Sequence, residues 1–374
     1  MTSSNISFVD KFEAGQLGKK ETFWRDHYNF LKDRGYTLRN RYSPDWVPSW
    51  KSQKNSSKSW RDCEDGQLIH YARVVDAVRA DGSLVVLKEI EIDSNPEEIP
   101  IGKLFSSETL AKHPKNHCVP FLDVIEPFEG SGLAFVVMPY LLKTVNPPFE
   151  TIGEVVAYFR QIFEGLEFMH NNHVSHGDCK ADNFMGDTVS LFKHPPHPST
   201  PYMRRDYRGE VSLSTSRTKK PVKYYLIDFG LSKVCRPEDA PHFRPPPWGG
   251  DKSVPEFSLP EAKPCDPFPV DVYCMGNSIR RYYTDGWDGF VKRKQGFDFM
   301  EGLIDDMTNS DPQKRPSMTD VVLRFEEIIK GLDDKKLRSP VLDVGEKLGA
   351  FRKISHWTTQ WINKLRGIPA IPST

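Results

Sequence analysis

The sequence lacks the hydrophobic runs that would place it in or across a membrane. No run of about 18 apolar residues occurs, and the first residues do not follow the basic, apolar and small-residue order of a secretory signal peptide. The second residue is threonine and the chain ends in Ile-Pro-Ser-Thr, so the signals for myristoylation and prenylation are missing too. We therefore expect an intracellular protein of the cytoplasm or nucleus.

The chain also lacks paired cysteines and an excess of charge of one sign. Its 6 cysteines form no C-x-x-C pair, and none stands at zinc-binding spacing from a second cysteine or from paired histidines. We expect free thiols in a reducing compartment. Lysine plus arginine and aspartate plus glutamate both number 51. Without a net positive field, nucleic acid is not expected as a partner.

What the sequence does contain is a series of strand patterns followed by a longer series of helical patterns. Two apolar, β-branched runs at 74–79 and 83–90 flank Asp81-Gly82, a strong hairpin signal, and a third strand is predicted at 133–138. Helical periodicity follows over 151–170, 271–283, 297–308 and 317–331. Strands first and helices afterwards predict an α+β fold with two lobes.

Three further segments stand outside this series. Residues 21–34 have apolar side chains at helical spacing before Gly35, which favours an amphipathic helix docked on the main body over one that binds a partner. Residues 187–221 are rich in proline and polar side chains and predict an exposed insertion. Residues 351–366 form an aromatic and basic helical stripe, for which packing on the main body is favoured over contact with a membrane or partner.

The strongest local signal is the run His-Gly-Asp-Cys-Lys-Ala-Asp-Asn at 176–183, followed later by a strand that ends in Asp228. Phosphoryl transfer needs an acidic residue to orient the attacking hydroxyl and oxygen ligands to hold magnesium against the phosphates. Asp178 suits the first role, and Asn183 and Asp228 suit the second. Lys180 can reach the transferring phosphoryl group and offset its charge.

These two segments resemble the catalytic loop and the magnesium-binding turn of eukaryotic protein kinases. The resemblance implies that Lys88 binds the α- and β-phosphates of ATP and that Met138 guards the back of the adenine pocket. It also implies hinge hydrogen bonds to adenine from the carbonyl of Pro139 and the amide of Leu141. ATP and Mg²⁺ are the implied cofactors. The chain further resembles a group of fungal protein kinase-like proteins.

The implied architecture is a bilobal protein kinase fold, with a small antiparallel β-rich N-lobe and a larger, mainly helical C-lobe. We place the kinase-like domain at 66–333, divided into an N-lobe at 66–141 and a C-lobe at 142–333 that contains the insertion. Residues 1–65 are then an N-terminal extension and residues 334–374 a C-terminal tail.

Downstream residues fit the same resemblance. Asp271 matches the buried aspartate that anchors the kinase catalytic loop. Arg315 matches the arginine that pairs with the glutamate of the Val-Pro-Glu run, Glu256. All three are expected to act structurally and not chemically.

The resemblance fails at the glycine-rich loop and leaves the partner of Lys88 open. The phosphate-covering turn is expected near 66–73, where Gly66 alone fits the glycine frame, although glycines there would let backbone amides approach phosphate. For the glutamate that pairs with Lys88 we favour Glu98, despite its short spacing, over Glu108. Weak or altered ATP binding is the expected consequence.

Gly177 stands where most protein kinases have the arginine that receives the activation-loop phosphate. We therefore expect any activity to be independent of phosphorylation at Ser232 or Ser253. Cys179, inside the catalytic run, is interpreted as a small buried hydrophobe and not as a redox switch.

The favoured function is transfer of the γ-phosphoryl group of ATP to a protein Ser or Thr hydroxyl, because Lys180 is the choice of Ser/Thr protein kinases at its position. One alternative is a pseudokinase, a nucleotide-binding or scaffolding module without turnover, which the degenerate glycine loop favours. A second is a small-molecule kinase of the aminoglycoside phosphotransferase type, which the His-Gly-Asp run also resembles. The substrate, the oligomeric state and the role of the insertion are not encoded in a recognisable motif.

Overall fold

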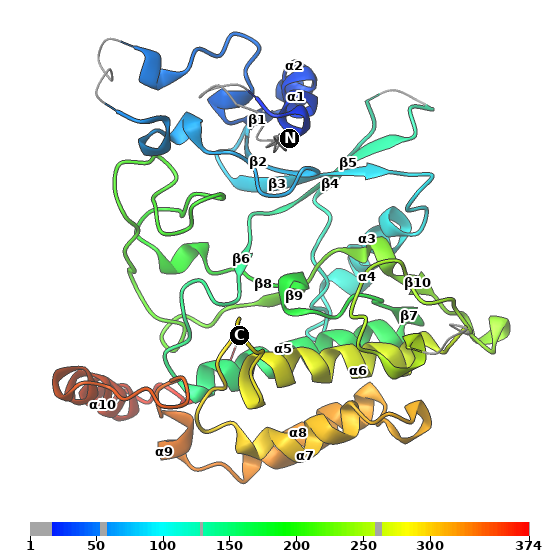
Figure 1. Cartoon of the computed structure of the whole chain (residues 1–374), viewed down its shortest axis with the longest axis vertical. Coiled ribbons are helices and arrows are strands. Elements are labelled where there is room, and N and C mark those ends of the chain that lie inside the picture. The colour runs from blue at the N-terminus through cyan, green and yellow to red at the C-terminus, as the bar shows by residue number, and fades with distance from the viewer. Residues whose placement is uncertain (1–16, 53–57, 128–129, 259–263, 374) are drawn as a thin grey trace, which may run out of the picture. The chain divides into compact units, whose positions relative to one another are not determined.

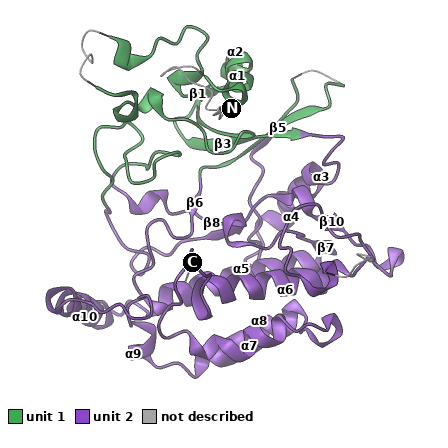
Figure 2. Ribbon diagram, in the orientation of Figure 1, with its two compact units in different colours: residues 1–90, 125–140, 194–212 green, residues 91–124, 141–193, 213–374 purple. Residues whose placement is uncertain are grey.

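A computed structural model describes residues 17–52, 58–127, 130–258 and 264–373 (Figure 1). It mixes helices with antiparallel sheets, so the predicted α+β class is confirmed. The chain divides into two compact units (Figure 2): unit 1 holds 1–90, 125–140 and 194–212, and unit 2 holds 91–124, 141–193 and 213–374. Parts of the predicted N-terminal extension, 1–16 and 53–57, lie outside the described residues.

Most of a five-stranded sheet in the order β1-β2-β3-β5-β4 belongs to unit 1. The strands are β1 (Tyr36–Leu38), β2 (Val74–Arg79), β3 (Leu84–Glu91), β4 (Asp123–Ile125) and β5 (Leu133–Pro139). The predicted hairpin is confirmed, because β2 pairs with β3 in antiparallel register and the turn between them contains Gly82 at φ +84°. The Asp81 carboxylate accepts a hydrogen bond of 2.9 Å from the Ser83 amide and closes this turn.

The predicted N-terminal helix is two short helices, α1 (Lys19–Asp26) and α2 (Tyr28–Asp33), separated at His27. Gly35 follows at φ +85°, a backbone conformation that favours glycine after a helix. Trp24 is fully buried, its ring centroid lies 5.7 Å from that of Phe135 on β5, and its Nε1 donates a hydrogen bond of 2.9 Å to the Ala72 carbonyl. The helices are therefore part of the core of unit 1, as the docked interpretation expected.

The expected phosphate-covering turn at 66–73 is not part of a tight hairpin. The strand beside β2 is β1, and residues 39–73 separate the two along the chain. Gly66 ends a short 3₁₀ helix (Glu64–Gly66), and a Cβ atom there would lie 1.8 Å from the Trp60 carbonyl oxygen. The close approach of the Trp60 backbone explains why residue 66 is a glycine. A contact of Gly66 with nucleotide stays a prediction.

Part of the predicted insertion belongs to unit 1 and is buried, so the prediction of an exposed insertion is wrong for this part. His197 has no exposed surface, and Arg205 Nη2 lies 2.7 Å from Asp76 Oδ2 on β2. Asp76 also accepts from Arg39 Nε at 3.0 Å. Polar side chains are buried here because ion pairs and hydrogen bonds compensate them, which a count of apolar residues does not detect.

Acid is expected to destabilise the protein through His197 below about pH 6.5. Burial lowers the pKa of His197 below its ordinary 6.5, Glu64 opposes this shift, and Arg39 adds to it. The unfolded chain then binds the proton more readily than the folded chain, so the free energy of unfolding falls by up to about 1.4 kcal/mol for each pH unit.

Urea unfolding at pH 7.5 and 5.5 (about one unit either side of that value) tests this expectation. His197→Gln should reduce the difference between the two pH values. His194→Gln, at an exposed histidine of the same segment, is the control and should keep it. An unchanged pH dependence in His197→Gln would refute the assignment.

Unit 2 is built around one long buried helix, α5 (Ile152–Asn171), which packs on α8 (Met318–Lys330). The Phe163 and Phe325 rings meet edge to face at 5.1 Å between these two helices. The other predicted helices are also present, as α6 (Pro267–Ile279) and α7 (Glu301–Met307). Two shorter helices, α3 (Glu98–Phe105) and α4 (Glu108–Ala111), precede them in the chain.

The C-terminal segment contains α9 (Asp334–Leu337) and α10 (Ala350–Leu365), so the predicted helix is present. The prediction that the apolar stripe of this helix packs on the main body is wrong. Gln360 and Asn363 are its buried residues, while Phe351 is 90% and Trp361 62% exposed. The polar face docks because its side chains find hydrogen-bond partners on the body. Within the described part of the chain, no helix combines the length and apolarity needed to cross a bilayer.

Candidate functional site

Two pairs of short strands in unit 2 hold the sequence-predicted loops. The pairs are β7 (Val174–Ser175) with β10 (Lys233–Val234), and β8 (Phe184–Gly186) with β9 (Tyr224–Leu226). Both pairs are antiparallel. The loop at 176–183 runs from β7 to β8, and the loop at 227–232 runs from β9 to β10, so the pairing places the two loops side by side.

Hydrogen bonds join these two loops near both ends. The Ile227 amide donates to the Asn183 carbonyl at 3.0 Å, next to the β8–β9 pair. The Ser232 hydroxyl donates to the His176 carbonyl at 2.8 Å, next to the β7–β10 pair. The predicted catalytic run and the predicted magnesium-binding turn are therefore held against each other by one backbone and one side-chain hydrogen bond.

Asp271 on α6 supports the first loop from inside the protein. Its carboxylate accepts hydrogen bonds of 2.7 Å each from the amides of His176 and Gly177, and His170 Nε2 lies 3.0 Å from it. Asp271 has no exposed surface. A buried carboxylate with two short amide bonds holds the loop firmly, which confirms the predicted anchor.

Asp178 is the centre of the side-chain cluster. Lys180 Nζ lies 2.6 Å from its Oδ2, and Asn183 Nδ2 donates to the same oxygen at 2.8 Å and to the Asp178 carbonyl at 3.0 Å. The other carboxylate oxygen, Oδ1, is buried and has no hydrogen-bond partner among the described residues. Such an oxygen can accept a hydrogen bond from a bound group.

Asn183 and Asp228 provide oxygen atoms suited to magnesium. Asn183 Nδ2 donates to the carbonyl and to Oδ2 of Asp178, so these bonds do not use the Asn183 amide oxygen. Asp228 follows the Asn183–Ile227 hydrogen bond directly and adopts the left-handed region at φ 66°. No cluster of three or more metal-binding side chains occurs within 17–52, 58–127, 130–258 and 264–373. One amide and one carboxylate fit a Mg²⁺ ion whose remaining ligands are phosphates and water.

Of the two candidate glutamates, Glu98 lies near this site. A Cβ atom on Gly230 would lie 3.3 Å from Glu98 Oε2 and 3.3 Å from Asp228 Oδ1, so both carboxylates border the same glycine. Glu98 is 3% exposed and begins α3, with Pro100 in the first turn as expected. The Glu108 side chain is 90% exposed and lies 3.5 Å from Lys112. Glu98, and not Glu108, therefore lies beside the loop of Asp228, and its pairing with Lys88 stays a prediction.

The remaining predicted nucleotide-binding residues lie mostly in unit 1. Lys88 is on β3, half-buried and in register with Val74. Met138 and Pro139 end β5 and are half-buried, and Leu141 is a buried residue at the start of a unit 2 segment. The structure therefore brings together Asp178, Lys180 and Asn183 beside the loop of Asp228. The nucleotide roles of the other residues stay predictions.

The structure gives a physical reason for Gly177. Its φ is +79°, and a Cβ atom there would lie 2.4 Å from the Leu231 carbonyl oxygen. An arginine at this position is therefore incompatible with the observed loop contact. Ser232 is buried and donates to the His176 carbonyl, and Ser253 donates to Asp251 at 2.8 Å.

Gly177→Ala should destabilise the protein more than Gly289→Ala. Gly289 has nearly the same φ, +76°, but nothing lies within 4 Å of the Cβ atom it would carry. The Gly289 change therefore costs backbone strain alone, about 1 kcal/mol. The Gly177 change adds overlap with Leu231, for a total of about 2–4 kcal/mol. Chemical unfolding of the two variants measures the difference, and equal losses would contradict the steric explanation.

Sequence reasoning missed Asp251, which fixes the segment before the Val-Pro-Glu run. Its carboxylate accepts from the Ser253 amide at 2.9 Å, contacts Asn277 Nδ2 and lies 3.4 Å from Arg281 Nη2. Burial alone would raise the pKa of Asp251, but these donors outweigh it and the pKa falls below its ordinary value. The signal, an aspartate two residues before a serine, is too common to identify such an anchor.

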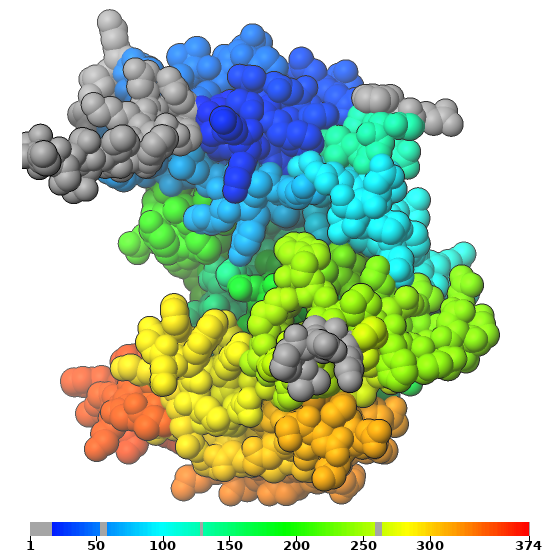
Figure 3. Space-filling view, turned by 45° about the vertical axis from the view of Figure 1, so that its right-hand side comes forward, coloured from blue at the N-terminus to red at the C-terminus, as the bar shows by residue number. Residues whose placement is uncertain are grey.

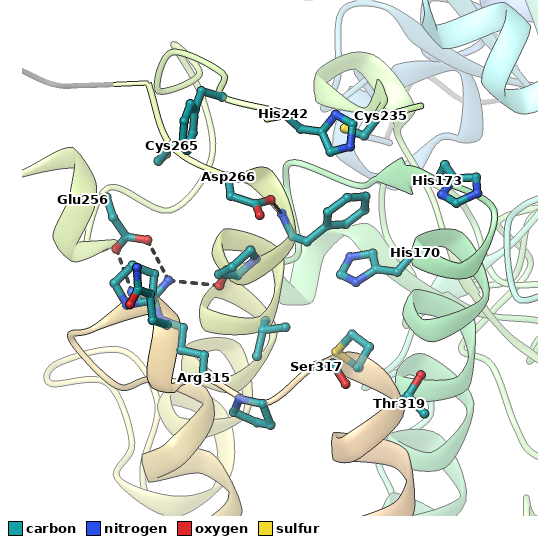
Figure 4. A pocket seen from close by; sticks show the side chains of 18 of the residues that line it. His170, His173, Cys235, His242, Glu256, Cys265, Asp266, Arg315, Ser317 and Thr319 are labelled. Carbon is teal, nitrogen blue, oxygen red and sulfur yellow. Dashed lines mark hydrogen bonds and ion pairs between the residues drawn. The ribbon is translucent and has the colours of Figure 1, made fainter. Parts of the chain in front are cut away.

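The predicted pair of Glu256 and Arg315 is present as two parallel hydrogen bonds of 2.8 and 2.7 Å (Figure 4). The pair lines a cavity of about 890 Å³ together with His170, His242 and Cys265. In the catalytic run, burial raises the pKa of the Cys179 thiol well above its ordinary value, and the side chain is 1% exposed. This agrees with a packing role for Cys179 and not with a reactive thiolate.

Comparison with known proteins points in the same direction. No protein family model matches the chain. A cyclin-dependent kinase G-2 of Oryza sativa is 28% identical over 113 residues, 28% of this chain and 15% of the relative. Cyclin-dependent kinase 11A of Homo sapiens is 28% identical over 121 residues, 29% of this chain and 15% of the relative.

A cyclin-dependent kinase C-2 of Oryza sativa is 23% identical over a longer stretch of 189 residues, 45% of this chain and 36% of that relative. The chain thus matches 15% to 36% of the length of these three proteins. Over part of its length, the chain is similar to cyclin-dependent kinases, and this weak similarity indicates a protein kinase-like family.

Proposed function

We propose that the protein is a Ser/Thr protein kinase with a bilobal kinase fold that moves the γ-phosphoryl group of ATP to a protein hydroxyl. The observation that carries the proposal is the Asp178 cluster. One carboxylate oxygen binds Lys180 and Asn183, while the other is a buried acceptor without a partner among the described residues. This arrangement suits a residue that orients a hydroxyl and accepts its proton.

In this proposal, ATP would supply the transferable phosphoryl group, and bound Mg²⁺ would neutralise part of the negative charge of the phosphates. Asn183 and Asp228 hold the ion through oxygen atoms. Asp178 orients the attacking hydroxyl through Oδ1. Lys180, already 2.6 Å from the Asp178 carboxylate, offsets the charge that develops on the phosphoryl oxygens.

The resemblance to kinases assigns the nucleotide contacts. Lys88 would bind the α- and β-phosphates and Glu98 would hold Lys88 in place. Met138, Pro139 and Leu141 would contact adenine. The 39–73 segment connects β1 to β2 in place of a short glycine-rich turn, and its sequence holds one glycine, Gly66, so close cover of the phosphates by backbone amides is not expected. Weak affinity for ATP follows.

The pseudokinase alternative rests on the same lack of a glycine-rich turn at 39–73. Two measurements distinguish a pseudokinase from an active kinase. The first is the thermal shift produced by ATP with and without Mg²⁺, and the second is γ-phosphate transfer to a generic basic protein. A thermal shift together with phosphate transfer to protein supports the proposed enzyme. Shift without transfer supports a nucleotide-binding scaffold, and transfer to an aminoglycoside instead of protein would support the small-molecule kinase.

A further inference from the structure

The exposed side of α10 carries an apolar stripe, and a polar side of the helix is turned toward the body of unit 2. Besides Phe351 and Trp361, the side chains of Ile354 and Leu365 are 65% and 66% exposed. With 3.6 residues per turn, these four residues share one face of the helix. Surface helices of globular proteins ordinarily present the opposite arrangement. Figure 3 shows α10, in orange-red, projecting at the edge of unit 2.

Polar contacts fix this orientation. Arg338 follows α9, and its Nη1 lies 3.4 Å from Gln360 Oε1, while its carbonyl oxygen lies 2.9 Å from His356 Nε2. Arg338 Nη2 also donates to the Ile368 carbonyl at 2.8 Å, just after the helix. The helix is therefore held by its buried polar side, and turning the stripe inward would break these bonds.

Ala370, five residues after the last residue of α10, holds this segment against α5. A Cβ atom on Gly153 would lie 2.0 Å from the Ala370 carbonyl oxygen, so the two backbones touch. Ala370 itself is 8% exposed. The exposed stripe is thus presented on a docked, already folded element, which lowers the entropic cost of binding.

Positive charge lies on both sides of the stripe. Arg352 and Arg366 are on one flank and Lys353 and Lys364 on the other, all exposed. Lys364 Nζ lies 3.1 Å from Asp334 Oδ2, a surface pair that leaves Lys364 63% exposed. No aspartate or glutamate follows Glu346 in the sequence. The helix therefore combines an apolar stripe with positive flanks, in which Asp334 partly compensates Lys364.

We propose that α10 binds the surface of a lipid bilayer that contains anionic headgroups. The apolar face enters the boundary between headgroups and acyl chains, and the flanking cations contact the headgroups. Trp361 suits this boundary, where tryptophan is favoured. The charge pattern also selects against a second copy of the chain, because two such helices face to face would bring like charges together.

Cosedimentation of the full chain with phosphatidylcholine vesicles, with and without phosphatidylserine, tests the proposal. We expect binding to the anionic vesicles, at least about tenfold weaker binding to neutral vesicles, and release by high salt. Phe351→Ser with Trp361→Ser should reduce binding by about tenfold or more. The matched control is Phe290→Ser, a side chain that is 79% exposed elsewhere on unit 2.

A variant with fewer positive charges separates the electrostatic contribution to binding from the apolar one. Arg352→Gln with Lys353→Gln should weaken binding to anionic vesicles, while Lys330→Gln, an exposed lysine on α8, should not. The altered side chains are exposed, so each variant should keep the thermal midpoint of the parent protein. Equal binding to both vesicle types, or full binding by the Phe351 and Trp361 variant, would overturn the proposal. Self-association abolished by that variant, without vesicle binding, would also overturn it and identify a second copy as the occupant.

Discussion

Replacing Asp178 with asparagine is expected to lower γ-phosphate transfer by about 10²–10⁴-fold. Asparagine keeps the shape of the side chain, but its amide does not accept the proton of the attacking hydroxyl. Lys180 also loses the carboxylate from which it lies 2.6 Å away. Because neither Asn183 nor Asp228 is altered, the thermal shift with ATP and Mg²⁺ should remain.

The matched control is Asp182→Asn in the same loop. The Asp182 side chain is 55% exposed and lies 2.7 Å from Lys143, so it makes a surface ion pair and has no part in the Asp178 cluster. We expect transfer close to that of the parent protein. Equal losses in the two variants would indicate a general disturbance of the loop, and a fully active Asp178→Asn protein would refute the base assignment.

Replacing Asp76 with asparagine is expected to cost about 3–5 kcal/mol of unfolding free energy. Asp76 contacts Arg39 and Arg205, and the side chains of Asp76 and Arg39 are 3% and 2% exposed. Burial alone would raise the pKa of Asp76, but the two arginines outweigh it and hold the pKa below its ordinary 3.8. The asparagine leaves two cations with weaker compensation in a largely dehydrated setting.

Urea unfolding of Asp76→Asn measures this loss, with Asp81→Asn as the control in the same hairpin. The Asp81 side chain is 60% exposed and lies 3.7 Å from Arg79, and asparagine is equally suited to the turn. We expect little change in the control. A loss in Asp76→Asn no larger than in Asp81→Asn would show that the buried ion pairs contribute nothing specific to unit 1.

Residues with local signals were predictable from the sequence. The Asp81-Gly82 turn, the periodicity of α5 and the stop at Gly35 each depend on a few neighbouring residues, and the structure contains all three. The catalytic run was recognisable because its chemistry needs fixed residue types at fixed spacing. The contacts of Asp271 and of the Glu256–Arg315 pair were predictable only through the resemblance to kinases.

Features that depend on distant segments were not predictable. Strand β1 is three residues long, too short for a periodic signal, and it pairs with β2 across residues 39–73. Asp76 and His197 are buried because segments far apart in the chain supply their partners. The apolar stripe of α10 faces outward because Arg338 binds the polar side of the helix. Periodicity alone shows that the apolar residues share one face of the helix, but not whether that face is buried or exposed.

The magnesium-dependent role of Asp228 is tested by γ-phosphate transfer from ATP, measured for the parent protein and for Asp228→Asn under the same conditions. If the paired loops at 176–183 and 227–232 form a magnesium-dependent phosphotransfer site, the parent protein transfers phosphate and the variant, still folded, does not. Equal transfer by both proteins would contradict a phosphotransfer site that includes Asp228.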